Sequence, residues 1–120
     1  MTDEADDIVD FSQVDALLDA AGREGVMEIM RAFWRSTDDL TARLSRQIDS
    51  SDLVEAARTA HAIKGSAANV GASLLASAAR TVEAFCKNGD VEAAAGALPT
   101  LARSYEIIRT ALAARIGAEV

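Results

Sequence analysis

The sequence has very little of the residue types that crosslink, ligate or kink small proteins. Its 120 residues include one cysteine, one histidine, one proline and one tryptophan. A single cysteine excludes an internal disulfide framework and a zinc site built from several cysteines. No apolar run approaches the roughly 20 residues that a membrane span needs, and the acidic start is unlike a basic signal peptide. We therefore expect a cytoplasmic protein that has no contact with a membrane.

Positive charge is also scarce, because 12 Lys and Arg stand against 19 Asp and Glu, for a net charge of −7. Such a protein has no excess of cations to neutralise the phosphates of a nucleic acid, so we expect no nucleic-acid partner. We predict that residues 1–10 form an acidic, partly disordered segment and that residues 11–120 form one domain. The initial methionine and the compact length favour a protein that stands alone. The acids of the first segment are Asp3, Glu4, Asp6, Asp7 and Asp10.

The remaining sequence predicts an all-α fold. Alanine is abundant, β-branched runs are absent, and apolar residues recur every three or four positions. Short connections between long amphipathic helices favour an antiparallel up-down four-helix bundle. We expect a short additional N-terminal helix to end at Gly22, before the first long helix of the bundle. The bundle helices are expected at about 24–48, 53–69, 73–88 and 91–116.

Two details of the later helices are predicted from the same periodicity. In the helix that begins near Ser73, the apolar stripe expected to face the core is Leu74, Ala78, Val82 and Phe85. Pro99 lies inside the last helix and removes one backbone hydrogen bond. We expect a kink there rather than a break, because the apolar stripe keeps its phase across the proline.

One stretch of the second bundle helix, residues 60–71, combines the histidine with a cation and a glycine. If Ala60 and Ile63 face the core, His61 and Lys64 lie one turn apart on a neighbouring edge. Gly65 costs about 1 kcal/mol relative to alanine, and it leaves space near the imidazole. A nucleophile, a nearby cation and a cleared approach are what reversible phosphoryl transfer needs. The alternative is a surface histidine, a solvated lysine and a glycine that permits close helix packing.

The segment from His61 to Gly71, HAIKGSAANVG, resembles the signature of histidine-containing phosphotransfer (HPt) domains. It has His, Lys and Gly at offsets zero, three and four, then a small residue, then a hydrophobic–Gly pair at nine and ten. The resemblance extends over about residues 12–117 in helix lengths and order. It implies a bundle that relays phosphoryl groups in two-component systems. In that family His61 would accept the phosphoryl group, Lys64 would shield its charge, and Gly65 would allow the partner to dock.

Glu83 is expected at nearly the same level as His61. At about 1.5 Å per residue, the ten residues from His61 to Gly71 span roughly 15 Å, and the twelve from Gly71 to Glu83 span roughly 18 Å back. By the HPt resemblance, Glu83 should accept a hydrogen bond from one ring N–H and leave the other nitrogen free to attack. A solvated glutamate is the alternative. Further candidates for the rim or for partner docking are Arg58, Gly65, Ser66, Ala68, Asn69 and Arg80.

The resemblance also implies the partners. His61 would take a phosphoryl group from the aspartyl phosphate of a receiver domain, for example in a hybrid sensor histidine kinase, and pass it to a response-regulator aspartate. We expect Mg²⁺ in the receiver's acidic pocket, and neither a cofactor nor a metal site on this chain. No glycine-rich nucleotide loop is present, so we expect no ATP-dependent kinase activity. Ala62, where a dimeric kinase-like bundle would have an acidic residue, favours a monomer.

Two other functions are alternatives to phosphotransfer. An HPt-like module could bind receiver or kinase domains without transferring phosphate. A carboxylate-bridged metal enzyme would need Glu-x-x-His pairs, but Arg58 stands three residues before His61. From Ala56 to Val82 there is no acidic residue, so the hairpin that bears His61 is locally cationic and suits a carboxylate-rich receiver pocket.

Overall fold

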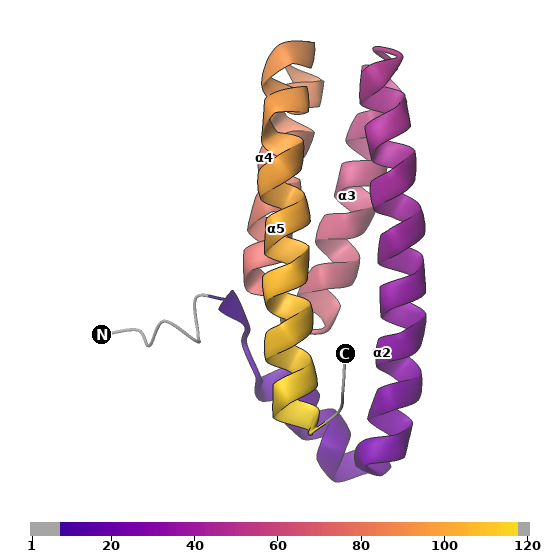
Figure 1. The fold of residues 1–120 in the computed structure, drawn as a ribbon, viewed down its shortest axis with the longest axis vertical. Coiled ribbons are helices and arrows are strands. Elements are labelled where there is room, and N and C mark those ends of the chain that lie inside the picture. Colours follow the sequence, from indigo (N-terminus) through magenta and orange to yellow (C-terminus); the bar gives the residue numbers. More distant parts are fainter. Residues whose placement is uncertain (1–7, 118–120) are drawn as a thin grey trace, which may run out of the picture.

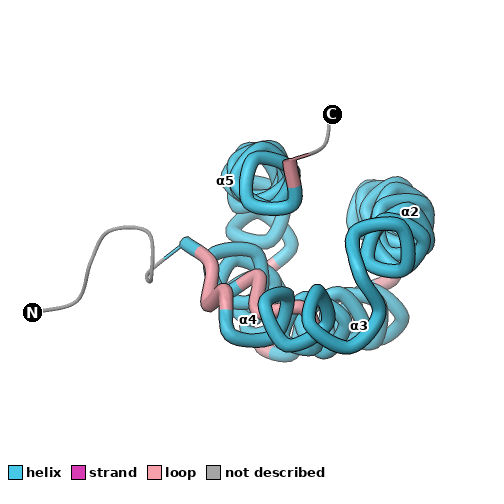
Figure 2. Tube along the Cα trace, turned by 90° about the horizontal axis from the view of Figure 1, so that it is seen from below, coloured by secondary structure: helices cyan, strands magenta, loops and turns pink. Residues whose placement is uncertain are grey.

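The computed structural model describes residues 8–117, which form helices and turns with no strand in that range. Connections of three residues join consecutive helices, which therefore run antiparallel (Figure 1). In the view along the bundle, α3 lies between α2 and α4, and α5 lies beside α4 (Figure 2). This arrangement confirms the predicted all-α antiparallel four-helix bundle. The helices are α2 (Ser12–Asp49), α3 (Leu53–Asn69), α4 (Ser73–Lys87) and α5 (Val91–Ile116).

The first helix in this range, α2, is divided by a sharp change of direction at Gly22. Gly22 has φ 72° and ψ 175°, a conformation outside the helical region. Residues 12–21 therefore form the short additional helix that the sequence predicted, and they lie across the lower end of the bundle in Figure 1. The guanidinium of Arg115 on α5 donates two hydrogen bonds to Asp15, at 3.0 and 2.7 Å, and ties this segment to the bundle.

The packed part of the chain begins before the predicted boundary at residue 11. Val9 is fully buried, and Ile8 and Phe11 pack against the core. The backbone N–H of Asp10 donates to the carbonyl of Gly71 in the α3–α4 turn, at 2.7 Å. Of the segment predicted to be partly disordered, residues 1–7 lie outside the described range, whereas residues 8–10 are part of the fold.

The core-facing side of α4 is one residue away from the predicted stripe. Val82 is fully buried as expected, but the other core residues of this helix include Leu75, Ala79 and Cys86. The predicted Leu74, Ala78 and Phe85 are only partly buried at its edges. The shift matters for the site, because it turns Glu83 toward α3 and buries it.

Pro99 does not divide the last helix, since α5 is continuous from Val91 to Ile116. Pro99 is exposed, and so is Ala95, whose carbonyl loses its usual donor. Solvent can therefore satisfy that carbonyl without a break in the helix. Within residues 8–117, none of the helices is both long enough and apolar enough to cross a membrane.

Candidate functional site

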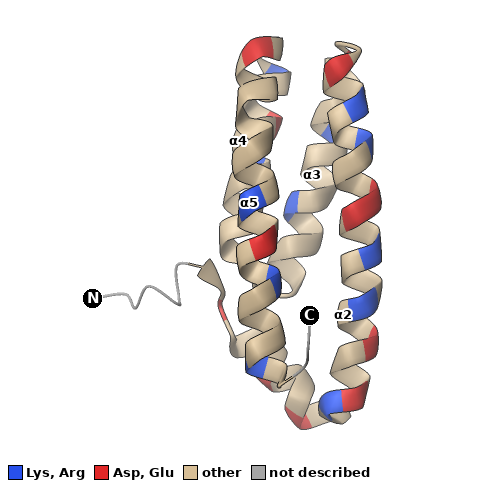
Figure 3. Cartoon of the chain, in the orientation of Figure 1, with Lys and Arg blue, Asp and Glu red and all other residues tan. Residues whose placement is uncertain are grey.

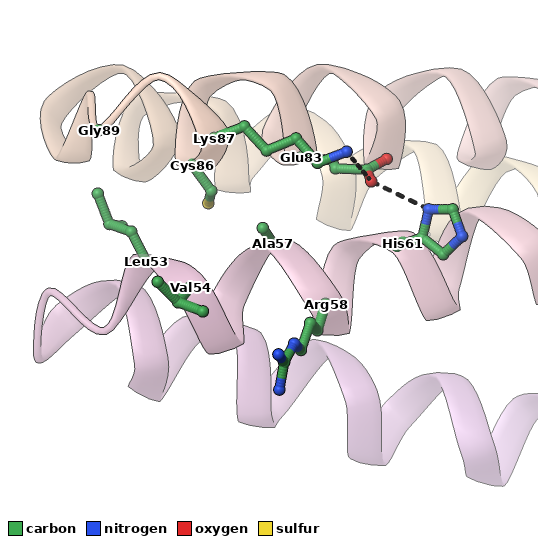
Figure 4. Close-up of a pocket in the computed structure, with 9 residues that line it drawn as sticks. All are labelled: Leu53, Val54, Ala57, Arg58, His61, Glu83, Cys86, Lys87 and Gly89. Carbon is green, nitrogen blue, oxygen red and sulfur yellow. Dashed lines mark hydrogen bonds and ion pairs between the residues drawn. The ribbon is translucent and has the colours of Figure 1, made fainter.

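His61 lies midway along α3 on the edge that faces α4. Its neighbours Ala60 and Ile63 are buried in the core, which fixes the helix face and turns His61 outward. The imidazole side chain is 64% exposed, and its Nδ1 lies 3.0 Å from Oε2 of Glu83 (Figure 4). The second ring nitrogen, Nε2, points away from α4 in the same view. One face of the ring is thus anchored, and the other nitrogen is open to an incoming group.

Glu83 is buried, with 7% of its side chain exposed, and it is surrounded by donors. Lys64 Nζ lies 3.2 Å from Oε1, and Lys87 Nζ lies 3.1 Å from Oε2. Burial alone would raise the pKa of the Glu83 carboxyl, but hydrogen bonds from Lys87, Lys64 and His61 outweigh it and lower the pKa to about 2. Glu83 is therefore an ionised acceptor at neutral pH, so His61 Nδ1 carries a proton, and in the neutral ring Nε2 then has the free lone pair.

A groove of about 700 Å³ extends from His61 along the α3–α4 seam. Val54, which lines this groove, is 69% exposed. Cys86 is buried beside it, and burial raises the pKa of its thiol. The groove offers a mainly apolar surface next to the histidine. Its lining residues, drawn in Figure 4, are Leu53, Val54, Ala57, Arg58, His61, Glu83, Cys86, Lys87 and Gly89.

Gly65 lies on the exposed face of α3, one turn beyond His61. A Cβ built at this position meets no atom within 4 Å, so close packing inside the molecule does not require glycine here. Ala68 and Asn69 are exposed on the next turn, and Ser66 is half-buried. The small residues therefore leave the surface beside the imidazole open along α3.

The basic residues expected around His61 differ in their surroundings. Basic and acidic residues are interspersed along α2 (Figure 3), whereas the acid-free stretch from Ala56 to Val82 brings Arg58, Lys64 and Arg80 to the His61 hairpin. Arg58 lines the groove but pairs with Glu55, at 3.0 Å, just outside that stretch. Arg80 is exposed on α4 one turn before Glu83 and lies outside the groove lining. The structure thus brings Lys64, but not Arg80, into contact with the His61–Glu83 pair.

Lys87 is the site residue that reasoning from the sequence missed. It follows Glu83 by four residues on α4, a spacing that places two side chains on the same helix face. That spacing was the available signal. It indicates a site residue only once Glu83 is known to be buried, because many exposed Glu–Lys pairs have the same spacing.

The arrangement can supply a neutral nucleophile in a weakly cationic setting. Glu83 and the two lysines together carry a net positive charge near the His61 ring, which favours an incoming anionic phosphoryl group. Within residues 8–117, no three His, Cys, Asp or Glu side chains come together in a way that could hold a metal ion.

Comparison with known proteins shows a consistent set of relatives. The "Histidine-containing phosphotransfer protein 1" of Arabidopsis thaliana is 25% identical over 104 residues, which cover 85% of this chain and 68% of the relative. The "Phosphorelay intermediate protein rdeA" of Dictyostelium discoideum is 27% identical over 84 residues, or 70% of this chain and 33% of that protein.

Solved structures with the same fold include two plant histidine-containing phosphotransfer proteins. MtHPt2 of Medicago truncatula superposes with a TM-score of 0.79 and 27% identity, covering 88% of this chain and 75% of that one. ZmHP2 of maize gives a TM-score of 0.78 at 24% identity, with 88% and 80% covered. The family model for the Hpt domain matches residues 28–114, which include His61, Lys64, Gly65 and Glu83. With that match over most of its length, the chain belongs to the Hpt domain family.

Proposed function

We propose that this chain carries a phosphoryl group on His61 Nε2 between two receiver domains of a phosphorelay. The observation that carries the proposal is the hydrogen bond from the exposed His61 ring to the buried, ionised Glu83. It fixes the proton on Nδ1 and leaves the Nε2 lone pair directed at solvent, where a partner can approach.

The transfer step needs no reactant besides His61 and the receiver's aspartyl phosphate. The Nε2 lone pair attacks the phosphorus of a receiver aspartyl phosphate, an N–P bond forms, and the P–O bond to the aspartate breaks and returns its carboxylate. The ring then bears positive charge and keeps its proton on Nδ1, where Glu83 stabilises it. Attack by the aspartate of a second receiver reverses these steps and regenerates neutral His61. Lys64 offsets charge on the phosphoryl oxygens.

The partners follow from this chemistry. They are a receiver domain of a hybrid sensor histidine kinase as donor and a response-regulator receiver as acceptor. Gly65, Ala68 and Asn69 would form the contact surface on α3, with Arg58 and Arg80 beside it. Mg²⁺ would belong to the acidic pocket of the receiver, and this chain would act as a cytoplasmic monomer without a cofactor of its own.

Labelling with a phosphorylated receiver tests the function. Incubation with the ³²P-labelled receiver should transfer label to the wild-type chain as an acid-labile phosphoramidate, and His61→Gln should take up none. Lys64→Ala should be labelled more slowly while keeping its helical circular dichroism spectrum. Label retained by His61→Gln would contradict the assignment of His61. Tight receiver binding by a wild-type chain that is never labelled would instead favour a non-catalytic binding module.

A further inference from the structure

Both lysines of the chain contact the same buried carboxylate. The sequence contains ten arginines but only two lysines, Lys64 and Lys87. Lys64 approaches Glu83 from α3 through Oε1, and Lys87 approaches it from α4 through Oε2. His61 shares Oε2 with Lys87. One carboxylate therefore holds two cations and the phosphoacceptor ring.

We propose that Lys87 is a positioning residue for phosphoryl transfer, which holds Glu83 in place so that Lys64 can leave it for the phosphoryl group. The proposal rests on the function proposed above for His61. It assigns different tasks to the two lysines: Lys64 exchanges partners during the reaction, whereas Lys87 stays with Glu83.

Charge balance around Glu83 favours such a second cation while the phosphoryl group approaches. The phosphoryl group that arrives at Nε2 attracts Lys64, which lies one turn after His61 on the same helix. Without Lys87, the departure of Lys64 would leave the buried carboxylate with only the neutral His61 ring until the N–P bond forms and the ring becomes positive, and the loss of a partner by a buried charge is strongly destabilising. With Lys87 in place, Glu83 keeps one cation throughout the reaction.

The geometry explains why Lys87 is suited to stay. It lies four residues after Glu83 on α4, and its ammonium meets Oε2 on the Nδ1 side of the ring, whereas Nε2 points away from α4 (Figure 4). A lysine ammonium is a compact charge that can occupy one carboxylate oxygen at a single point. The planar fork of an arginine would tend to occupy both oxygens and so compete with Lys64 for Oε1.

The first experiment needs no phosphoryl transfer, so it separates this proposal from the function on which it rests. Carboxyl ¹³C NMR should follow the titration of Glu83 against the charged groups that face it, which are Lys87 on α4 and Lys64 and His61 on α3. In Lys87→Gln the midpoint should rise from the wild-type value toward the ordinary range of a glutamate. Imidazole ¹⁵N shifts should show a less uniform Nδ1–H tautomer. An unchanged midpoint and tautomer would overturn the proposal, even if His61 is phosphorylated normally.

The second experiment is a double-mutant cycle on the transfer rate from a phosphorylated receiver. Lys87→Gln should slow transfer about tenfold in the wild-type background, because coupled residues in one network commonly interact at this level. In a Glu83→Gln background there is no carboxylate to hold, so the same change should alter the rate by less than about twofold. An equal loss in both backgrounds would show that Lys87 acts directly on the phosphoryl group or the receiver, and would overturn the positioning role.

Arg103→Gln is the matched control for charge. Arg103 is exposed on α5 and contributes one positive charge outside the groove lining. Its loss should leave both the Glu83 titration and the transfer rate unchanged. If Arg103→Gln slows transfer as much as Lys87→Gln, net charge rather than Lys87 governs the rate, and the proposal fails.

Discussion

His61 and Glu83 lie on different helices, yet Nδ1 of the imidazole and Oε2 of the carboxylate are 3.0 Å apart. The two side chains have opposite environments, since the imidazole is 64% exposed and the carboxylate 7%. The proposed phosphoacceptor thus faces solvent, while the carboxylate that contacts it is held inside the bundle. This asymmetry gives the pair different behaviour toward acid and toward mutation.

Acid should weaken the fold through Glu83. The pKa of its carboxyl is about 2 in the folded protein, below the ordinary value of 4.5. A lowered folded-state pKa means that the contribution to stability is complete above about pH 5 and is lost as the pH falls toward 2. Urea unfolding should therefore find wild type more stable than Glu83→Gln by about 1–3 kcal/mol at pH 7, with the gap closing between pH 4.5 and pH 2.

The control for that measurement is Glu28→Gln, which changes an exposed glutamate on α2. It should stay within about 0.5 kcal/mol of wild type at pH 7. A difference between wild type and Glu83→Gln that stays constant from pH 7 to pH 2 would show that Glu83 is not held ionised by its neighbours.

Gly65 should make the bundle less stable than alanine would, while leaving room for a receiver to dock. A Cβ there meets nothing within 4 Å, so Gly65→Ala should stabilise the bundle by up to about 1 kcal/mol through helix propensity. The larger Gly65→Gln should weaken receiver binding, measured by titration calorimetry, and slow phosphotransfer. Gly96 on α5 is equally exposed and uncrowded, so Gly96→Ala and Gly96→Gln are matched controls. If the Gly65 variants bind the receiver like the Gly96 variants, Gly65 has no role in docking.

Much of this arrangement could be predicted from the sequence because helices impose a fixed period. The spacing of Ala60 and Ile63 indicated the exposed side of α3, and similar distances along α3 and α4 brought Glu83 nearly level with His61. Gly22 marked the end of the short first helix. These predictions needed only helix geometry and a conformation that glycine adopts easily.

Other features depend on choices that periodicity does not decide. In α4 the neighbouring pairs Leu74–Leu75, Ala78–Ala79 and Phe85–Cys86 give two apolar stripes one residue apart, and the sequence does not show which faces the core. Ile8 and Phe11 were candidates to dock on the bundle, but their acidic segment gives no sign that Val9 between them is fully buried. Lys87 acquires its partner only because the actual register of α4 buries Glu83.

The α2–α5 seam should contribute to stability without affecting phosphotransfer. Tyr105 on α5 is buried, and its single hydroxyl proton is shared between two acceptors on α2, Asp38 Oδ1 at 2.9 Å and the carbonyl oxygen of Trp34 at 3.0 Å. Burial and the neighbouring Asp38 raise the pKa of Tyr105. Tyr105→Phe should lower the free energy of unfolding by about 1 kcal/mol and leave the transfer rate unchanged. A loss of transfer without a loss of stability would place this seam in the functional surface.

Gly71 is the position at which a single methyl group should be most harmful. It has φ 75° in the α3–α4 turn, and a Cβ there would overlap the carbonyl oxygen of Asp10. Alanine at such a φ costs about 1–2 kcal/mol by itself. The overlap would also displace the backbone of Asp10, whose N–H donates a hydrogen bond to the carbonyl of Gly71. Gly71→Ala should therefore lower the free energy of unfolding by more than this conformational cost.

Gly89 supplies the comparison that isolates the overlap. Its φ is 72°, nearly that of Gly71, but a Cβ there meets no atom within 4 Å. Gly89→Ala should thus show the conformational cost alone, and the excess loss in Gly71→Ala measures the contact with Asp10. Hydrogen exchange should also show faster exchange of the Asp10 amide in Gly71→Ala but not in Gly89→Ala. Equal destabilisation by the two substitutions, with the Asp10 amide still protected, would mean that the close contact between Gly71 and Asp10 is not needed to hold residues 8–10 against the α3–α4 turn.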